Sequence, residues 1–273
     1  MRANPHTPTS SRRRKKTGRR HPLATVALIA IGLVVTGGGY AAFNSSTASA
    51  DTSNTASQSS IDQGKKLFLA NCATCHGLDA VGTDNGPSLV GVGSAAVDFQ
   101  VGTGRMPMAM QGPQAEEKPP QFTDKQIGQL ADYIASLAPG PSIPDSSLTD
   151  PDGNAANGAQ LFRINCAMCH NVAGAGGALT EGKFAPNLRT VSPTHIYEAM
   201  LTGPQNMPVF NDRNISPQGK KDIITYLMFV RNNPSPGGLE LGSLGPVSEG
   251  LFAWIFGLGA IVALTVWITA KSN

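Results

Sequence analysis

Two short motifs combine thiol and imidazole side chains at a spacing that can do chemistry. Residues 72–76 read CATCH and residues 166–170 read CAMCH. On a helical turn the positions i, i+3 and i+4 share one face, so two thiols can reach the vinyl groups on one porphyrin edge while the imidazole ligates its iron. The pattern is that of c-type haem attachment. The predicted haem-binding residues are Cys72, Cys75 and His76 in the first motif and Cys166, Cys169 and His170 in the second.

Each haem iron also needs an axial ligand from a distant part of the chain. Methionine is the typical partner of histidine in cytochromes c, and a Met-Pro pair recurs at 106–107 and 207–208. Met106 and Met207 are therefore the predicted sulfur ligands. Met108 and Met110 lie beside Met106 and stay as alternatives, although we expect them to pack in the loop or haem pocket.

Other roles for the cysteines fit the sequence less well. Zinc ligand pairs need not each be followed by histidine, thioredoxin-like pairs need a βαβ context, and a two-residue spacer rarely serves a structural disulfide. His195 has no motif beside it. We expect it to be exposed to solvent or to cap a helix.

The middle of the chain is one unit written twice. Residues 63–76 align with 157–170 at a constant offset of 94, with Gly, Leu, Phe, Asn, Cys, Ala, Cys and His in step, and 123–137 align more loosely with 216–230. Two copies indicate tandem domains. We predict a first domain at 61–139 (the first repeat), a Pro-rich linker at 140–153 and a second domain at 154–233 (the second repeat).

Each repeat is predicted to open and close with a helix, with Gly/Pro-rich loop between them and no strand. Residues 123–126 (TDKQ) resemble a capping box, and Ser216-Pro217 supplies an N-cap followed by proline at the first helical position. The fold class is therefore all-α. Gly64 and Gly158 are expected where the first helix crosses the last, beside Tyr133 and Tyr226 respectively.

Two apolar stretches flank the repeats. Residues 1–22 form a basic leader, and residues 23–43 are uncharged, so they read either as a transmembrane helix or as the apolar region of a signal peptide with a cleavage site at 48–50. Residues 44–60 form a Ser/Thr-rich tether. After a linker at 234–250, residues 251–270 form a second uncharged run of 20 residues, a predicted transmembrane helix.

The charge distribution supports an exported protein over a nucleic-acid-binding one. Eight Lys and Arg lie within the first 20 residues. The rest of the chain has 13 Lys and Arg and 18 Asp and Glu, so its net charge is −5. A basic block directly before an apolar segment is explained by positive-inside topology. The repeats should then lie outside the cytoplasm, with both termini inside if the leader is retained.

Tandem class I cytochrome c domains between N-terminal and C-terminal membrane segments resemble the dihaem cytochrome c subunit (cytochrome cc) of the actinobacterial cytochrome bc1 complex. The resemblance implies two covalently bound haems c and an electron-transfer role within a quinol–cytochrome c reductase, without an independent catalytic site. It implies a cytochrome b subunit, a Rieske iron–sulfur subunit and a cytochrome c oxidase as partners. Electrons would enter from the Rieske subunit and leave to the oxidase, with the haems of residues 72–106 and 166–207 as entry and exit by position.

Two other functions remain open. A dihaem subunit of a periplasmic dehydrogenase often carries a third haem and no such C-terminal anchor. A haem enzyme such as a dihaem peroxidase needs an open axial position, against which the two Met-Pro pairs argue.

Overall fold

The structure is a computed structural model that describes residues 22–47, 56–233 and 246–271. The chain divides into two compact units, Met1–Thr55 and Ala56–Asn273. Most of the basic leader, the cleavage site at 48–50, part of the tether and most of the linker at 234–250 lie outside the described residues.

The first unit contains the helix α1 (Pro22–Thr47), which covers the predicted apolar segment. Its 26 residues carry no acidic group in the first turn and no basic group in the last. Within its described side chains the clearly apolar stretch is Val26–Gly38, which is shorter than a bilayer-spanning segment. A membrane-spanning role for residues 23–43 therefore stays a prediction.

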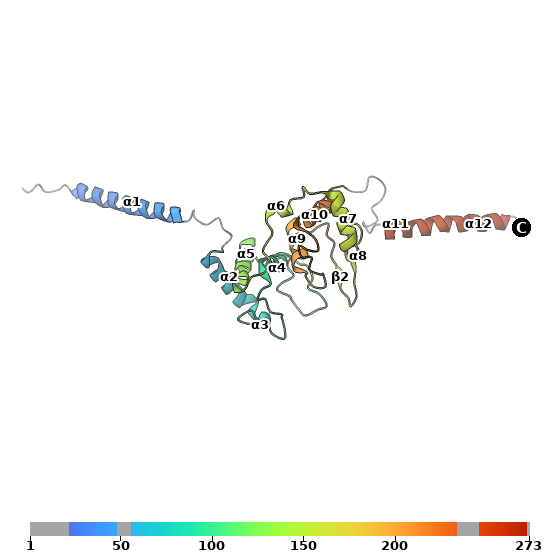
Figure 1. Cartoon of the computed structure of the whole chain (residues 1–273), viewed down its shortest axis with the longest axis horizontal. Coiled ribbons are helices and arrows are strands. Elements are labelled where there is room, and N and C mark those ends of the chain that lie inside the picture. Colours follow the sequence, from blue (N-terminus) through green and yellow to red (C-terminus); the bar gives the residue numbers. More distant parts are fainter. Residues whose placement is uncertain (1–21, 48–55, 234–245, 272–273) are drawn as a thin grey trace, which may run out of the picture. The chain divides into compact units, whose positions relative to one another are not determined.

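The first repeat is helical, as expected (Figure 1). Its helices are α2 (Gln58–Asn71), α3 (Ala73–His76), α4 (Gly93–Gly102) and α5 (Asp124–Leu137). Both α2 and α4 pack against α5. The buried core between them is built mainly from aromatic and aliphatic side chains, including Phe68, Val97, Ile127, Leu130, Tyr133 and Ile134.

The second repeat has the same helical plan with its own core. Its helices are α7 (Ala155–Asn165), α8 (Ala167–His170), α9 (Pro193–Thr202) and α10 (Pro217–Asn232), and the short helix α6 (Ser146–Thr149) lies in the linker before them. The pair α7 and α10 corresponds to α2 and α5. The core includes Phe162, Ile196, Tyr197, Met200, Ile223, Ile224 and Leu227.

A short β-hairpin departs from the strand-free prediction. Strands β1 (Gly177–Ala178) and β2 (Phe184–Ala185) pair antiparallel, with Gly177 opposite Ala185. The hairpin lies in the glycine-rich loop between His170 and Met207, a segment seven residues longer than the one between His76 and Met106. Two residues per strand are too few to show the alternating pattern by which strands are read from a sequence.

The expected helix crossings are present in both repeats. A methyl group on Gly64 would overlap the carbonyl oxygen of Gln129 on α5, and one on Gly158 would overlap that of Asp222 on α10. The ring centroids of Phe68 and Tyr133 lie 5.4 Å apart at the first crossing. Those of Phe162 and Tyr226 lie 5.5 Å apart at the second. Glycine is needed because each pair of helices meets with its backbones in direct contact.

The predicted caps of the closing helices are also present. Thr123 and Gln126 form a reciprocal capping box at the start of α5. The Ser216 hydroxyl accepts a hydrogen bond from the backbone N–H of Gly219, with proline at the first position of α10. These local signals fix where each repeat's last helix begins.

One pair of helices contributes to the contact between the two repeats. Helix α4 of the first repeat packs against α9 of the second. Both are ten-residue helices that precede the Met-Pro segment of their own repeat. Equivalent elements of the two copies therefore form the interface.

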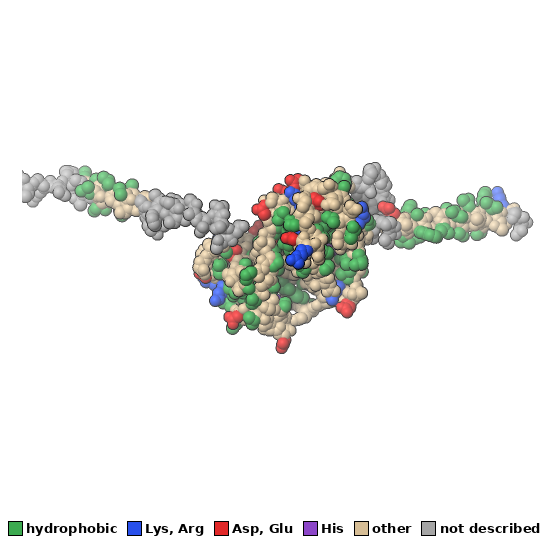
Figure 2. Space-filling model, viewed as in Figure 1, with side chains coloured by type: hydrophobic (Ala, Val, Ile, Leu, Met, Phe, Trp, Pro, Cys, Tyr) green, Lys and Arg blue, Asp and Glu red, His purple; other side chains and the backbone are tan. Residues whose placement is uncertain are grey.

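The chain ends in an apolar helix composed of α11 (Pro246–Phe252), the π-helical stretch η2 (Ala253–Leu258) and α12 (Gly259–Lys271). Within the described residues, Ser248–Lys271 is the one helix long and apolar enough to cross a membrane. Figure 2 shows hydrophobic side chains over its visible surface, and Trp254 and Trp267 are both more than half exposed. An exposed apolar helix of this length fits a membrane anchor.

Candidate haem sites

The two cysteine–histidine motifs form equivalent helical turns. Each begins where a long helix ends, α2 at Cys72 and α7 at Cys166. The backbone N–H of His76 donates to the carbonyl of Cys72 at 3.0 Å, and that of His170 donates to the carbonyl of Cys166 at 2.9 Å. The turn brings the side chains at i, i+3 and i+4 to one face. All four cysteines are free thiols, as attachment to a haem requires.

A backbone carbonyl orients each histidine ring. Nδ1 of His76 lies 2.8 Å from the carbonyl oxygen of Pro87, and Nδ1 of His170 lies 3.0 Å from that of Pro186. A carbonyl only accepts, so Nδ1 carries the proton and Nε2 keeps its lone pair for a metal. Histidines that ligate metals usually have such a partner on the other ring nitrogen.

This orienting contact was missed in the sequence analysis. The signal was present, since Gly86-Pro87-Ser88-Leu89 and Ala185-Pro186-Asn187-Leu188 occupy corresponding places in the two repeats. It says nothing about the hydrogen bond until the loop is folded back against the motif.

Burial keeps the reactive groups uncharged. Desolvation, followed by the neighbouring thiol, raises the pKa of Cys72 to about 11 and that of Cys166 to about 12. Desolvation also lowers the pKa of His170 despite its hydrogen bond to Pro186. Neutral imidazole is the form that ligates iron.

A cavity opens in front of the second motif. It encloses about 1100 Å³ of space, part of it open to solvent. Cys166, Cys169, His170 and Met207 all line it, and most of the remaining wall is apolar. The apolar wall and the S, S, N and S donor set fit a haem c.

The first repeat contributes to the wall of this cavity. Phe99, Arg105 and Gln114 line it together with residues of the second repeat. The Gln114 side chain donates to the carbonyl of Phe184 at 3.0 Å and accepts from its N–H at 2.9 Å. The loop that carries Met106 thus also closes the neighbouring pocket.

The three candidate methionines of the first repeat differ in how exposed their side chains are. Met106 is partly buried and packs against the core, whereas Met108 is 38% and Met110 79% exposed. Nζ of Lys118 donates to the carbonyls of Arg105 and Pro107 on either side of Met106. This arrangement favours Met106 over its two neighbours as a ligand.

The expectation for His195 was wrong. Its side chain is 22% exposed, and its Nε2 lies 3.9 Å from a carboxylate oxygen of Asp98. The helix is capped by Ser192, whose hydroxyl accepts from the N–H of His195. His195 is covered because α9 packs on α4, a contact between repeats that the sequence of either helix does not reveal.

Comparison with known proteins agrees with this geometry. The family model described as "Cytochrome C oxidase, cbb3-type, subunit III" matches residues 59–134 and again 153–227. The chain is 46% identical over 231 residues to the cytochrome bc1 complex cytochrome c subunit of Corynebacterium efficiens, covering 79% of this chain and 78% of that one. It is 43% identical over 274 residues to the subunit of that name from Mycobacterium tuberculosis, covering 96% and 95%.

A more distant relative shares about half the chain. The cbb3-type cytochrome c oxidase subunit FixP of Sinorhizobium medicae is 33% identical over 140 residues, 48% of this chain and 45% of that one. The similarity over nearly the full length is therefore to the bc1 subunits. The chain belongs to the family of cytochrome bc1 complex cytochrome c subunits, electron-transfer proteins with covalently bound haem c.

Proposed function

We propose that this chain carries two covalently bound haems c, one in each of two tandem domains, and passes single electrons through both. The observation that carries the proposal is the repetition of one arrangement, in which two free thiols and a carbonyl-oriented imidazole share a turn and the same repeat supplies a partly buried or cavity-lining methionine. The haem supplies the redox chemistry, while the protein positions it and tunes its potential.

The residues have distinct roles in this proposal. The thioether links would be formed by the four cysteines, and the iron would be held between one histidine and one methionine in each domain. The first haem would be held by Cys72, Cys75, His76 and Met106, and the second by Cys166, Cys169, His170 and Met207. With both axial positions filled, neither iron offers a site for substrate, which favours electron transfer over haem-based catalysis.

The proposed route runs within a respiratory complex. Electrons would arrive from a Rieske iron–sulfur subunit associated with a cytochrome b subunit and leave to a terminal cytochrome c oxidase. Relatives named for the cytochrome bc1 complex at 43–46% identity support the first part of this route. The resemblance to cytochrome cc supplies the second part.

The membrane arrangement follows from charge and hydropathy. The C-terminal helix would anchor the chain, and the basic leader would hold residues 1–22 in the cytoplasm. The haem domains would then lie on the extracytoplasmic side. Both termini would be cytoplasmic if the leader is retained.

Haem counting tests the cofactor proposal. Pyridine haemochrome analysis of the purified chain should give two covalent haems per polypeptide. The double variants Cys72→Ala/Cys75→Ala and Cys166→Ala/Cys169→Ala should each give one. Met168→Leu is the matched control, because Met168 lies inside the second motif but is 93% exposed, and this variant should retain both. A wild-type count below two would overturn the proposal.

Companion subunits test the route. Purification from membranes in mild detergent should recover cytochrome b, Rieske and cytochrome c oxidase subunits with this chain. Recovery of a flavoprotein or quinoprotein dehydrogenase in their place would overturn the proposed route and leave the haem assignment standing.

A further inference from the structure

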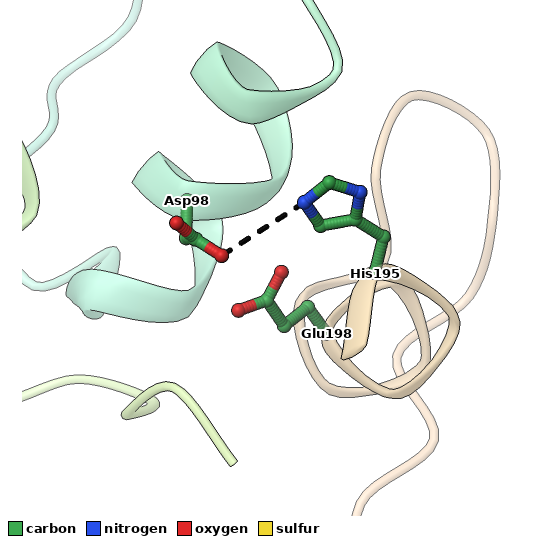
Figure 3. A group of neighbouring side chains, drawn as sticks. All are labelled: Asp98, His195 and Glu198. Atoms are coloured by element: carbon green, nitrogen blue, oxygen red, sulfur yellow. Dashed lines mark ion pairs between the residues drawn. The ribbon is translucent and has the colours of Figure 1, made fainter. Parts of the chain in front are cut away.

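Three ionisable side chains meet at the interface between the two repeats. Asp98 comes from α4, and His195 and Glu198 lie one turn apart on α9 (Figure 3). One ligand atom from each lies within 4.8 Å of those of the other two. Nε2 of His195 lies 3.9 Å from the Asp98 carboxylate. The group therefore converges on one point from both repeats.

No donor forms a hydrogen bond to the ionised carboxylate of Glu198. The residue is fully buried, and neither carboxylate oxygen has a hydrogen-bond partner. Burial of an ionised carboxylate is very unfavourable unless it is paired or coordinates a metal. Desolvation first, then the charge of the Asp98 carboxylate and a hydrogen bond that protonated Glu198 can donate to it, raises the pKa of Glu198 to about 10. A cation beside this carboxylate is needed if it is to be ionised.

The imidazole is suited to be a ligand. Desolvation is the largest influence on the pKa of His195 and lowers it, so the ring favours its neutral form. The Arg105 guanidinium lowers this pKa as well, whereas the carboxylates of Asp98 and Glu117 raise it. A neutral ring presents a lone pair to a cation, and a bound cation would displace the proton that Glu198 holds at its raised pKa.

We propose that Asp98, His195 and Glu198 bind one divalent first-row metal ion, of which Zn²⁺ is the probe, and that this ion links the two repeats. One imidazole nitrogen and two carboxylate oxygens form a donor set that zinc accepts, with water as a fourth ligand. Bonds of about 2.0–2.2 Å place tetrahedral ligand atoms about 3.3–3.6 Å apart. The separation of 3.9 Å between His195 and Asp98 needs only a small closing movement.

This site adjoins the haem pocket. His195 lines the cavity, but neither Asp98 nor Glu198 does. The metal would connect α4, which precedes Met106, to α9, which precedes Met207. Its effect would be to hold the two repeats in one arrangement, whichever partners supply and remove electrons.

Zinc titration of the haem-loaded protein tests the site. Full-length protein in detergent, stripped by a chelator, is titrated with ZnCl₂ by calorimetry and its zinc content is then measured. We expect one Zn²⁺ per chain, with affinity reduced at least tenfold in Glu198→Gln and in Asp98→Asn. Glu181→Gln is the matched control, because Glu181 is an exposed residue of the β1–β2 hairpin, and its affinity should equal that of wild type.

The readouts distinguish this site from others. Zinc-edge X-ray absorption should show only N and O donors, including one imidazole, and this signature should disappear in the Asp98 and Glu198 variants. An unchanged haem content and visible spectrum shows that a variant has folded, and Asp98→Asn serves if Glu198→Gln does not fold. Absence of zinc binding in wild type, or equal affinity in folded Glu198→Gln or Asp98→Asn, overturns the proposal. Sulfur ligation would also overturn it.

Discussion

At the scale of single residues, the methionine segment of the first repeat offers three sulfur atoms but only one that is partly buried against the core. Loss of a Met ligand leaves the iron with a weaker sixth ligand and lowers the reduction potential, because the thioether favours the reduced state. We expect Met106→Leu to remove half of the long-wavelength sulfur-to-iron absorption of the oxidised protein. The same spectrum should be unchanged in Met108→Leu and Met110→Leu. A loss in either of these variants would move the ligand to that residue.

Arg105 is a residue whose importance is visible only in the folded chain. It belongs to the first repeat, yet it lines the cavity of the second. It is buried, lies 4.9 Å from the centroid of the Phe99 ring and 3.5 Å from the Glu117 carboxylate. Desolvation lowers its pKa from the ordinary arginine value. The nearby positive charge should favour the reduced haem.

We therefore expect Arg105→Gln to lower the reduction potential of the second haem. As a scale for such an effect, a unit charge about 10 Å from any redox centre contributes about 1.7 kcal/mol at an effective dielectric constant of about 20, or roughly 70 mV for one electron. Partial compensation by Glu117 makes a decrease of a few tens of mV the expected result of a spectroelectrochemical titration. Arg213→Gln, at an exposed position, should leave the potential unchanged because solvent screens it. An unchanged potential in Arg105→Gln would contradict this role.

Candidate residues for holding haem could be picked out of the sequence because attachment depends on spacing within one turn. Cys72, Cys75 and His76 need no information from the rest of the chain. Arg105 and His195 could not be predicted in the same way, because each acts across the interface between repeats. The pattern of apolar residues within one repeat does not reveal which of its side chains contact the other repeat.

At the scale of helices, the crossing of α2 and α5 is the contact on which the first repeat depends most directly. Gly64 was predicted to lie there because it recurs as Gly158 in the second repeat. The β1–β2 hairpin and the α4–α9 contact were not predicted. The hairpin is too short to show an alternating pattern, and α4 has small or apolar residues in most positions, so no face stands out as an interface.

Two glycine variants in the first repeat should change stability in opposite directions. In Gly64→Ala the new methyl group would overlap the backbone of Gln129, and overpacking of this kind costs about 1–3 kcal/mol or more. Gly128→Ala has nothing within 4 Å of the new carbon. It should stabilise α5 by up to about 1 kcal/mol, because alanine favours a helix over glycine. Thermal unfolding of the haem-loaded protein, followed by circular dichroism, measures both changes. Equal melting temperatures for the two variants would contradict the close crossing.

At the scale of the whole molecule, the chain combines a water-facing pair of repeats with an apolar C-terminal helix. The segment Ser248–Lys271 has 24 residues and is about 36 Å long as a helix, enough to cross a hydrocarbon core of about 30 Å. Lys271 follows the apolar run, and its Nζ lies 4.8 Å from the centroid of the Trp267 ring. Tryptophan and lysine at the end of an apolar helix are typical of a membrane interface.

Two chain variants separate the contributions of the terminal segments. When residues 1–50 are replaced by a cleavable signal peptide, the protein should stay in the membrane after an alkaline wash, because the C-terminal helix alone suffices as an anchor. When residues 246–273 are removed as well, the protein should be released and still contain two haems, because both buried cores lie between residues 61 and 228. Release of the first variant would show that α11–α12 does not anchor the chain. Loss of haem from the second would show that the repeats depend on the membrane segment for their assembly, and the division into an electron-carrying part and an anchor would then be wrong.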